Sequence, residues 1–230
     1  MIATNLHAVT DRIAQACASA GRATGSVQLL AVSKTFGPDA VQQAFDAGQR
    51  AFGENYIQEA VDKITALAAL PIEWHCIGPI QSNKTRLVAE HFQWVHTVDR
   101  LKIAQRLSDQ RPAHLPPLQV CIQVNVDGGP TKSGVLPAEA AALALAVRAL
   151  PRLQLRGIMC IPEPAPDFVA ARAVFMSAKA IFDAIVEQGV PLDTLSMGMS
   201  GDLDAAIAGG STMVRVGSAI FGARHYPGVA

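Results

Sequence analysis

The sequence predicts one α/β domain, residues 1–230, folded as a (β/α)8 TIM barrel with an extra helix at its N-terminus. From residue 27 onward, eight short β-rich runs alternate with longer helical stretches. Strands that are separated by helices pair in parallel, and the 230 residues are close to the about 250 that one such barrel uses. No Ser-, Gly- or Pro-rich linker and no internal repeat divides the chain. A doubly wound open sheet gives a similar pattern and stays open as the alternative fold.

The N-terminal segment is typical of an amphipathic helix. Apolar residues recur at helical spacing at Ile2, Leu6, Val9, Ile13 and Cys17. The segment lacks the charged start, apolar middle and small-residue cleavage site of a signal peptide. We therefore expect an extra helix ahead of the barrel and a cytoplasmic protein.

The strands and helices that follow are marked by their composition and by helix-ending residues. Pro38 and Pro137 stand in the first turns of two helical stretches, Asp167 opens a third, and Gly48 and Gly189 follow the ends of two of them. These signals separate eight predicted strands. The strands are 27–35, 50–54, 72–78, 94–98, 118–126, 155–160, 194–198 and 213–217.

The fifth predicted strand shows which of its faces lines the barrel. Its residues alternate strictly, with Val120, Ile122, Val124 and Val126 on one face and Cys121, Gln123 and Asn125 on the other. We expect the valine face to pack against helices and the polar face to point into the barrel. Asn125, near the carboxyl end of the strand, then indicates a lined site at that end. The alternative is an edge strand with one wet face.

Composition and charge exclude several classes of protein. Lys and Arg number 19, as do Asp and Glu, so the formal net charge is zero, whereas a nucleic-acid-binding domain usually has a pI above about 9. Half of the residues are apolar and 17% are charged, against about 25% in ordinary domains, which indicates a large core and not disorder. The longest apolar run, Ala140–Val147, is too short to span a bilayer. We expect neither a nucleic-acid partner nor a membrane partner.

The four cysteines do not form a metal or disulfide pattern. Cys17, Cys76, Cys121 and Cys160 are far apart and make no CxxC pair. Most of them lie in apolar stretches, which favours reduced core thiols. We expect no metal site.

Lys34 is the first candidate for chemistry. It closes the apolar run from Leu29 to Ser33, at the strand end where barrels carry their active sites. A lysine partly withdrawn from water loses some of its preference for the charged form and can form a Schiff base with an aldehyde. The alternative is a solvated lysine in a loop.

The loops after the seventh and eighth strands are the second candidate. Ser200 is predicted to cap a helix after strand seven, and Gly217 and Ser218 follow strand eight. Barrels most often hold phosphate in these two loops. Plain helix capping with glycine turns is the alternative, and Asp202 in the predicted first helical turn favours it, because a carboxylate repels a phosphate.

Arg215 lies between two valines and should therefore point into the barrel. A buried arginine needs an acceptor, which could be a carboxylate such as Glu54 or a ring nitrogen of a cofactor. An aldehyde held by Lys34, a ring nitrogen at Arg215 and a phosphate at Ser200, Gly217 and Ser218 together describe pyridoxal 5′-phosphate.

Four segments resemble the pyridoxal-phosphate homeostasis proteins, the YggS/PROSC family, and the resemblance spans essentially the whole chain. The segments are Ala31-Val32-Ser33-Lys34-Thr35, Phe52-Gly53-Glu54-Asn55-Tyr56, Trp74-His75-Cys76-Ile77-Gly78-Pro79-Ile80-Gln81-Ser82-Asn83-Lys84, and the stretch from Gly198-Met199-Ser200 to Val214-Arg215-Val216-Gly217. The resemblance implies a single-domain barrel similar to the N-terminal domain of alanine racemase. It also implies a cofactor bound as an imine, without established catalysis.

The resemblance implies roles for individual positions. The matching positions are Lys34 for the Schiff base, Ser200, Gly217 and Ser218 for the phosphate, Arg215 for the ring nitrogen, Asn55 and Met197 for the lining of the site, and Lys132, in Thr131-Lys132-Ser133-Gly134, for accepting or transferring the cofactor. Cys76 and Gly201 depart from the family pattern, where an aromatic and a polar residue are common. His75 and Lys84 belong to the fingerprint without an assigned role; His75 is interpreted as a hydrogen-bonded barrel histidine and Lys84 as a solvated lysine that could help admit an anion.

We expect a carrier of pyridoxal 5′-phosphate in vitamin B6 homeostasis, a monomer that supplies apo-enzymes and catalyses no reaction itself. The eight strand–helix units use all of the sequence, which leaves no added domain to provide a second base. An arginine at the ring nitrogen also weakens the ring as an electron sink. The alternatives are a racemase or related enzyme with Lys34 as a base, and a phosphosugar-binding barrel whose lysine forms no imine.

Overall fold

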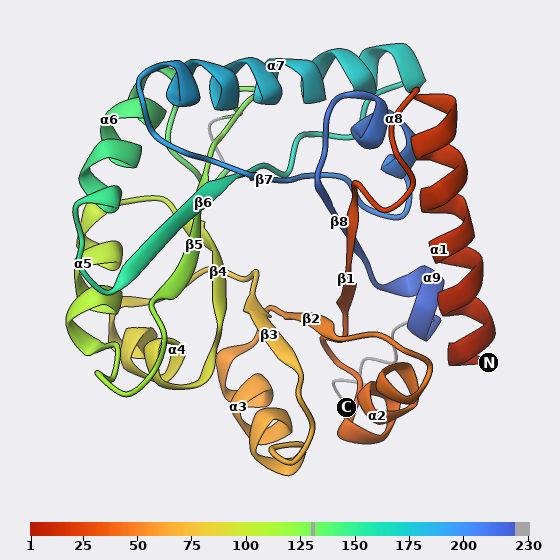
Figure 1. Ribbon diagram of the computed structural model, residues 1–230, viewed down its shortest axis with the longest axis horizontal. Coiled ribbons are helices and arrows are strands. Elements are labelled where there is room, and N and C mark those ends of the chain that lie inside the picture. The colour runs from red at the N-terminus through yellow and green to blue at the C-terminus, as the bar shows by residue number, and fades with distance from the viewer. Residues whose placement is uncertain (130–131, 224–230) are drawn as a thin grey trace, which may run out of the picture.

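The protein folds as a closed barrel of eight parallel strands. The structure, a computed structural model, describes residues 1–129 and 132–223 (Figure 1). The strands pair in sequence order from β1 to β8, and β8 pairs with β1 in parallel. Because the sheet closes, it is not a doubly wound open sheet, and the predicted TIM barrel is confirmed.

All eight predicted strands form, but most are shorter than predicted at their carboxyl ends. The first strand, for example, ends at Val32 instead of residue 35, because the chain turns there toward the loop that carries Lys34. The strands are β1 (Gln28–Val32), β2 (Ala51–Glu54), β3 (Glu73–Cys76), β4 (Trp94–Val98), β5 (Leu118–Gln123), β6 (Leu153–Met159), β7 (Thr194–Ser196) and β8 (Met213–Val216).

The helices surround the barrel, and the three marked by Pro38, Pro137 and Asp167 begin where these signals predict (Figure 1). Pro38 lies in the first turn of its helix, and the Asp167 carboxylate accepts a hydrogen bond from the Ala170 N–H at 2.8 Å, which caps the longest helix. The helices are α1 (Ile2–Ser19), α2 (Pro38–Asp46), α3 (Ile57–Ala66), the 3-10 helix η1 (Ser82–Lys84), α4 (Thr85–His91), α5 (Leu101–Gln110), α6 (Pro137–Arg148), α7 (Phe168–Glu187), α8 (Leu203–Ala208) and α9 (Ser218–Phe221).

The extra helix α1 packs on the outside of the barrel against α8, α9 and α2 (Figure 1). It buries Leu6, Val9, Ile13 and Cys17, which belong to the apolar stripe predicted from the sequence. The helices α8 and α9 have only 6 and 4 residues, so they cover little of the barrel surface by themselves. The long α1 therefore completes the outer layer where the chain closes the barrel.

The two faces of β5 lie as predicted. Val120, Ile122 and Val124 belong to the large core cluster between sheet and helices. Cys121 instead packs with Trp94 and Met159 in a separate cluster inside the barrel. The interior is thus divided into small apolar clusters with polar side chains between them, and these polar side chains matter for the site.

All four cysteines are buried and free, and burial raises the pKa of Cys76, Cys121 and Cys160 to about 12. Within residues 1–129 and 132–223 no helix is both long and apolar enough to cross a membrane. The same residues contain no cluster of His, Cys, Asp or Glu that could hold a metal ion.

Candidate functional site

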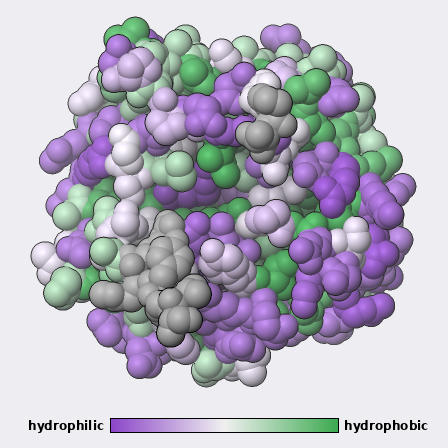
Figure 2. All heavy atoms as spheres, turned by 180° about the vertical axis from the view of Figure 1, so that it is seen from behind, coloured by the Kyte–Doolittle hydropathy of each residue, from purple (hydrophilic) through white to green (hydrophobic). Residues whose placement is uncertain are grey.

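A cavity of about 240 Å³ lies at the carboxyl ends of the strands and contains most of the predicted site residues. Figure 2 views the molecule from the side opposite to Figure 1 and shows a surface hollowed near its centre, where hydrophilic and hydrophobic residues meet. A larger hollow of about 490 Å³ lies between α1 and the amino ends of β1 and β2, away from these residues. The cavity is lined by Val32, Lys34, Asn55, Ile77, Ile161, Met199, Ser200, Gly201, Arg215, Gly217 and Ser218.

Lys34 sits in a tightly fixed turn after β1. Thr35, the next residue, has φ of 69°, a left-handed conformation that is rare for a β-branched residue. Its N–H donates to the Glu59 carboxylate at 2.8 Å. A strained backbone next to a candidate nucleophile is typical of a functional site that the surrounding structure holds in place.

The buried ammonium of Lys63 organises this turn. It donates to the Ser33 carbonyl oxygen at 2.8 Å and pairs with Glu54 at 2.8 Å and with Glu59 at 2.6 Å. The Ser33 hydroxyl also donates to Glu54 at 2.6 Å. Burial raises the pKa of Glu54, while the Lys63 charge and the two hydrogen bonds oppose that shift. Residues on both sides of Lys34 are therefore fixed to one ionic cluster.

Asn55 follows β2 directly and lines the cavity. A Cβ on Gly78 would lie 2.2 Å from the Asn55 carbonyl oxygen, so only glycine permits this close approach of the chain after β3. The neighbouring Ile77 lines the cavity. The fingerprint around His75 thus contributes a close backbone contact and an apolar wall, which the sequence argument did not assign.

The loop after β7 brings Ser200 to the cavity, but not as a helix cap. The helix α8 begins at Leu203, its N-cap is Asp202, and Ser200 lies two residues earlier, so the predicted capping role is wrong. The Asp202 carboxylate accepts from the Met199 N–H at 2.6 Å, and this bond holds the turn together. The Ser200 carbonyl oxygen accepts from Arg12 of α1 at 2.8 Å.

The loop after β8 supplies Gly217 and Ser218. Gly217 is the N-cap of α9, and a Cβ on it would lie 3.1 Å from the Val32 carbonyl oxygen of β1. The absence of a side chain therefore lets the last strand pack closely against the strand that leads to Lys34. Both residues line the same cavity as Ser200.

Arg215 points into the barrel, as the alternation predicts, and is 4% exposed. It donates to the Ser196 carbonyl oxygen at 2.8 Å, to the Ser196 hydroxyl at 2.9 Å and to the Cys160 carbonyl oxygen at 2.9 Å. The alternative partner Glu54 pairs with Lys63 instead. Burial lowers the pKa of Arg215, but a guanidinium remains protonated at neutral pH.

Met197 differs from its predicted place. It is fully buried in the core cluster that faces the helices, because Ser196 beside it takes the inward direction. Met199, two residues further on, lines the cavity. The sequence signal that could have found this is the same in–out alternation that correctly placed Arg215.

Three other candidates lie outside the lining of the cavity. Lys132 donates to the carbonyl oxygen of Ile161, a lining residue, at 2.9 Å and pairs with Glu163 at 3.0 Å, so it is next to the rim. Thr131 of its motif is outside the described residues. The Asn125 side chain donates to the Gly129 carbonyl oxygen at 2.9 Å. Lys84 ends η1 and is not among the lining residues.

These features define a class of protein: a parallel (β/α)8 barrel with a lysine after its first strand and small-residue loops after its last two strands, all at one cavity. The family model for the alanine racemase N-terminal domain matches residues 4–225. The pyridoxal phosphate homeostasis protein of Pseudomonas aeruginosa is 58% identical over 225 residues, covering 98% of this chain and 96% of that protein. Its counterpart from Escherichia coli K12 is 55% identical over 228 residues, covering 98% and 97%.

Solved structures agree. PipY of Synechococcus elongatus with PLP bound matches with a TM-score of 0.79 at 38% identity, covering 91% of this chain and 100% of that chain. Alanine racemase of Corynebacterium glutamicum, at 18% identity and a TM-score of 0.70, covers 100% of this chain and 62% of its own and shows the fold alone. The chain therefore belongs to the pyridoxal phosphate homeostasis proteins, within the family of the alanine racemase N-terminal domain. The resemblance inferred from the sequence is confirmed.

Proposed function

We propose that this protein binds pyridoxal 5′-phosphate in the cavity as a Schiff base with Lys34 and supplies it to apo-enzymes. In forming this link, Lys34 Nζ bonds to the aldehyde carbon and one water molecule leaves. Ser200, Gly217 and Ser218 would hold the phosphate, and Arg215 would donate to the ring nitrogen. When bound, the group supplies an aldehyde that reacts with amines.

The observation that carries the proposal is the convergence of Lys34, Arg215 and Ser200 on one cavity. These residues come from opposite ends of the chain, and their side chains suit an aldehyde, a ring nitrogen and a phosphate in turn. The Asn55 side-chain oxygen is buried and accepts no hydrogen bond from the described residues, so it is available as an acceptor for a bound group. The names of the relatives and the PLP-bound PipY structure support the same ligand.

The lining of the cavity supports binding without catalysis. Among the described residues that line it, Lys34 and Arg215 are the ionisable ones. Racemisation needs an acid or base on each face of the substrate, and a guanidinium is a poor base. An arginine at the ring nitrogen also leaves that nitrogen unprotonated, which weakens the ring as an electron sink.

An absorbance titration with pyridoxal 5′-phosphate tests the proposal. The wild-type protein should gain the visible band of a lysine-bound cofactor at one equivalent per chain, and Lys34→Ala should not. Lys102→Ala, which removes an exposed lysine on α5, is the matched control and should behave like wild type. A colourless wild-type protein, or an unchanged band in Lys34→Ala, would contradict the site.

Delivery and catalysis are tested separately with the loaded protein. The loaded protein should restore the activity of an apo-enzyme faster than free cofactor does at the concentration that dissociates from the protein on dilution. Lys132→Ala should bind the cofactor normally but transfer it more slowly. The racemase alternative predicts D-alanine from L-alanine. Turnover that disappears in Lys34→Ala would replace the carrier function by that enzyme activity.

A further inference from the structure

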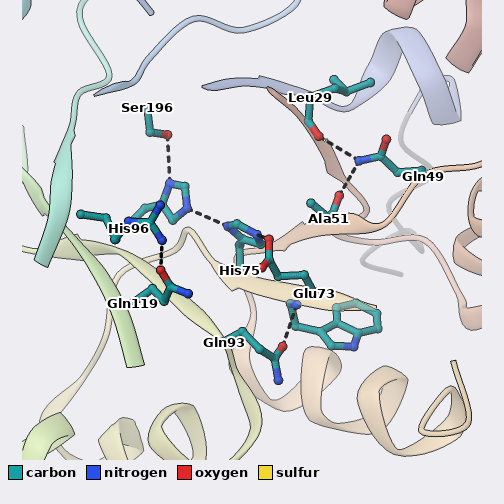
Figure 3. Close-up of polar contacts among 11 residues, drawn as sticks. Leu29, Gln49, Ala51, Glu73, His75, Gln93, His96, Gln119 and Ser196 are labelled. Atoms are coloured by element: carbon teal, nitrogen blue, oxygen red, sulfur yellow. Dashed lines mark hydrogen bonds and ion pairs between the residues drawn. The ribbon is translucent and has the colours of Figure 1, made fainter. Parts of the chain in front are cut away.

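A chain of hydrogen-bonded side chains crosses the interior of the barrel and ends at Arg215. Figure 3 shows Glu73, His75, His96 and Ser196 pointing toward one another across the barrel. Glu73 Oε1 lies 2.9 Å from His75 Nε2, and His75 Nδ1 lies 2.9 Å from His96 Nε2. His96 Nδ1 lies 2.9 Å from the Ser196 hydroxyl, which accepts from Arg215 at 2.9 Å. We call these five residues the relay.

The chemistry of the groups fixes one direction for every hydrogen bond. An ionised carboxylate can only accept, so His75 Nε2 donates to Glu73. A neutral imidazole has one donor and one acceptor, so His75 Nδ1 accepts from His96 Nε2, and His96 Nδ1 accepts from the Ser196 hydroxyl. The Ser196 oxygen in turn accepts from Arg215, because a guanidinium can only donate.

Burial supports the neutral state of both imidazoles. His75 and His96 are fully buried, and burial is the largest cause that lowers the pKa of each, for His96 well below its ordinary value of 6.5. The hydrogen bond from His75 lowers the pKa of Glu73, which keeps that carboxyl ionised. With the hydrogen on Nδ1 of each ring, the His75 Nε2 acceptor would face the Glu73 carboxylate, which is also an acceptor. The reverse direction of the hydrogen bonds is therefore excluded.

The relay connects opposite ends of the molecule. Glu73 is the first residue of β3, at the amino end of the strand, and its side chain is 39% exposed. Arg215 lines the cavity at the carboxyl ends. The three acceptors that Arg215 contacts are uncharged oxygens, so the relay leads this buried cation to a carboxylate.

We propose that Glu73 is the remote counter-ion of Arg215, and that His75, His96 and Ser196 are positioning residues that transmit its charge and fix the donor geometry of the guanidinium. This inference rests on the proposed function in one respect, namely that the group receiving the hydrogen bond of Arg215 is the ring nitrogen of pyridoxal 5′-phosphate. Hydrogen bonds in such a chain polarise one another, so loss of the terminal charge should be felt at the other end.

Other charged or titratable groups lie near each end and provide controls. At the Glu73 end, Trp94 stacks on His75 with ring centroids 5.2 Å apart, and the Arg156 guanidinium lies 4.9 Å from the Trp94 ring centroid. Arg156 is paired with Asp193, which directly precedes β7 and lies outside the relay, and the Arg156 charge also contributes to the lowered pKa of Glu73. The charge of Arg215 acts on His96, and Asp202 is the carboxylate that acts on Arg215. The thiols of Cys121 and Cys160 have a pKa of about 12 and are therefore uncharged at neutral pH.

Long-range ¹⁵N–¹H correlation spectra of the ligand-free protein test the relay without any cofactor. Both His75 and His96 should be neutral and carry their hydrogen on Nε2 between about pH 6 and 8. An imidazolium, or a hydrogen on Nδ1 of either ring, would overturn the assigned direction.

Glu73→Gln tests the counter-ion role, because glutamine keeps an acceptor oxygen but removes the charge. Without the charge, Arg215 should withdraw more electron density from the ring nitrogen. The pH at which the absorbance of the lysine-bound cofactor changes should then fall by about 0.3 to 1 unit, and Ser196→Ala should shift it in the same direction. Asp193→Asn removes an equal charge at the same end of the barrel but outside the relay, so it should shift this pH by less than about 0.2 unit.

The outcomes separate this inference from the proposed function. Equal shifts in Glu73→Gln and Asp193→Asn would show that the charge acts directly through space, and this result would overturn the relay. No shift in Glu73→Gln would overturn it as well. A wild-type protein that forms no visible band refutes the proposed function, while the ¹⁵N spectra still decide the direction of the relay. Circular dichroism of each variant confirms that it is folded before the comparison is made.

Discussion

At the residue scale, the most consequential side chain outside the cavity is Lys63. Its ammonium contacts the Ser33 carbonyl oxygen and two carboxylates, and one of these, Glu59, also holds the Thr35 N–H. Removing one partner of a buried ion pair leaves the other charge buried without a counter-ion. The stability of the barrel and the placement of Lys34 therefore depend on the same group.

Lys63→Met should lower the free energy of unfolding by about 3 to 5 kcal/mol, because Glu54 would lose its buried counter-ion. Urea unfolding followed by circular dichroism measures this change. Lys179→Met is the matched control: Lys179 pairs with Asp183 on the surface of α7, and its loss should change stability by less than about 1 kcal/mol. Equal effects of the two substitutions would contradict the structural role of Lys63.

Single residues also show where sequence reasoning succeeds and fails. Alternation along a strand depends on local geometry, so the inward direction of Arg215 could be predicted. The partners of a side chain depend on which segments meet in space. The hydrogen bond from Lys63 to the Ser33 carbonyl oxygen, and the contact of His96 with Ser196, join separate strand–helix units that no spacing rule connects. For this reason, the site was predicted but its supporting residues were not.

At the scale of elements, the number and order of strands and helices could be predicted, because each has its own periodicity and end signals. The ends near the site could not. The predicted strand 27–35 ends at Val32 because the following turn is held by tertiary contacts of Glu54, Glu59 and Lys63. The start of α8 was misplaced because Ser200 and Asp202 are both good capping residues. The N-cap position falls on Asp202, whose carboxylate accepts from the Met199 N–H and makes no capping bond to the helix.

Helix α1 and the turn that follows it are each attached to the barrel by one arginine, Arg12 in the helix and Arg22 after it. Arg12 donates to the Ser200 carbonyl oxygen at 2.8 Å and also pairs with Asp204. Arg22 donates to the carbonyl oxygens of Ile207 at 2.8 Å and Ser211 at 2.7 Å, beyond the site loop. The first arginine thus holds a loop of the candidate phosphate site, and the second holds only the end of α8 and the turn after it.

We expect Arg12→Ala to weaken cofactor binding by about three- to tenfold, because the loop of Ser200 would lose an anchor and become less ordered. Arg22→Ala is the matched control and should lower the melting temperature without changing the affinity. Absorbance titrations and thermal unfolding of both variants measure these effects. If Arg22→Ala weakens binding as much as Arg12→Ala, the effect belongs to the helix as a whole and not to the loop contact.

At the scale of the whole molecule, the buried histidines make stability depend on pH. In the folded state, burial lowers the pKa of His75 and His96 below the ordinary value of 6.5 that applies in the unfolded chain. Below that pH the unfolded chain binds protons that the folded barrel does not. Their contribution to stability is therefore fully present above the unfolded pKa and is lost as the pH falls below it.

The free energy of unfolding should accordingly fall between about pH 7 and 5, by up to about 1.4 kcal/mol per pH unit for each buried histidine. Urea unfolding at several pH values measures the slope. His96→Asn should reduce the slope, while His91→Gln, which changes a histidine near the end of α4, should leave it unchanged. A stability that does not vary over this range would show that the two rings bind protons in the barrel as readily as they do in the unfolded chain.

Barrel closure also has a consequence for protein synthesis. β1 pairs with β8, and Leu30 stands opposite Arg215, so the strand that pairs with the one leading to Lys34 is translated long after it. A nascent chain exposes Lys34 long before Arg215 and Ser218 have been translated. Under the proposed function, the chain can retain pyridoxal 5′-phosphate only after β8 and the loop that follows it have been made. The bound cofactor in turn makes separation of β1 from β8 less favourable.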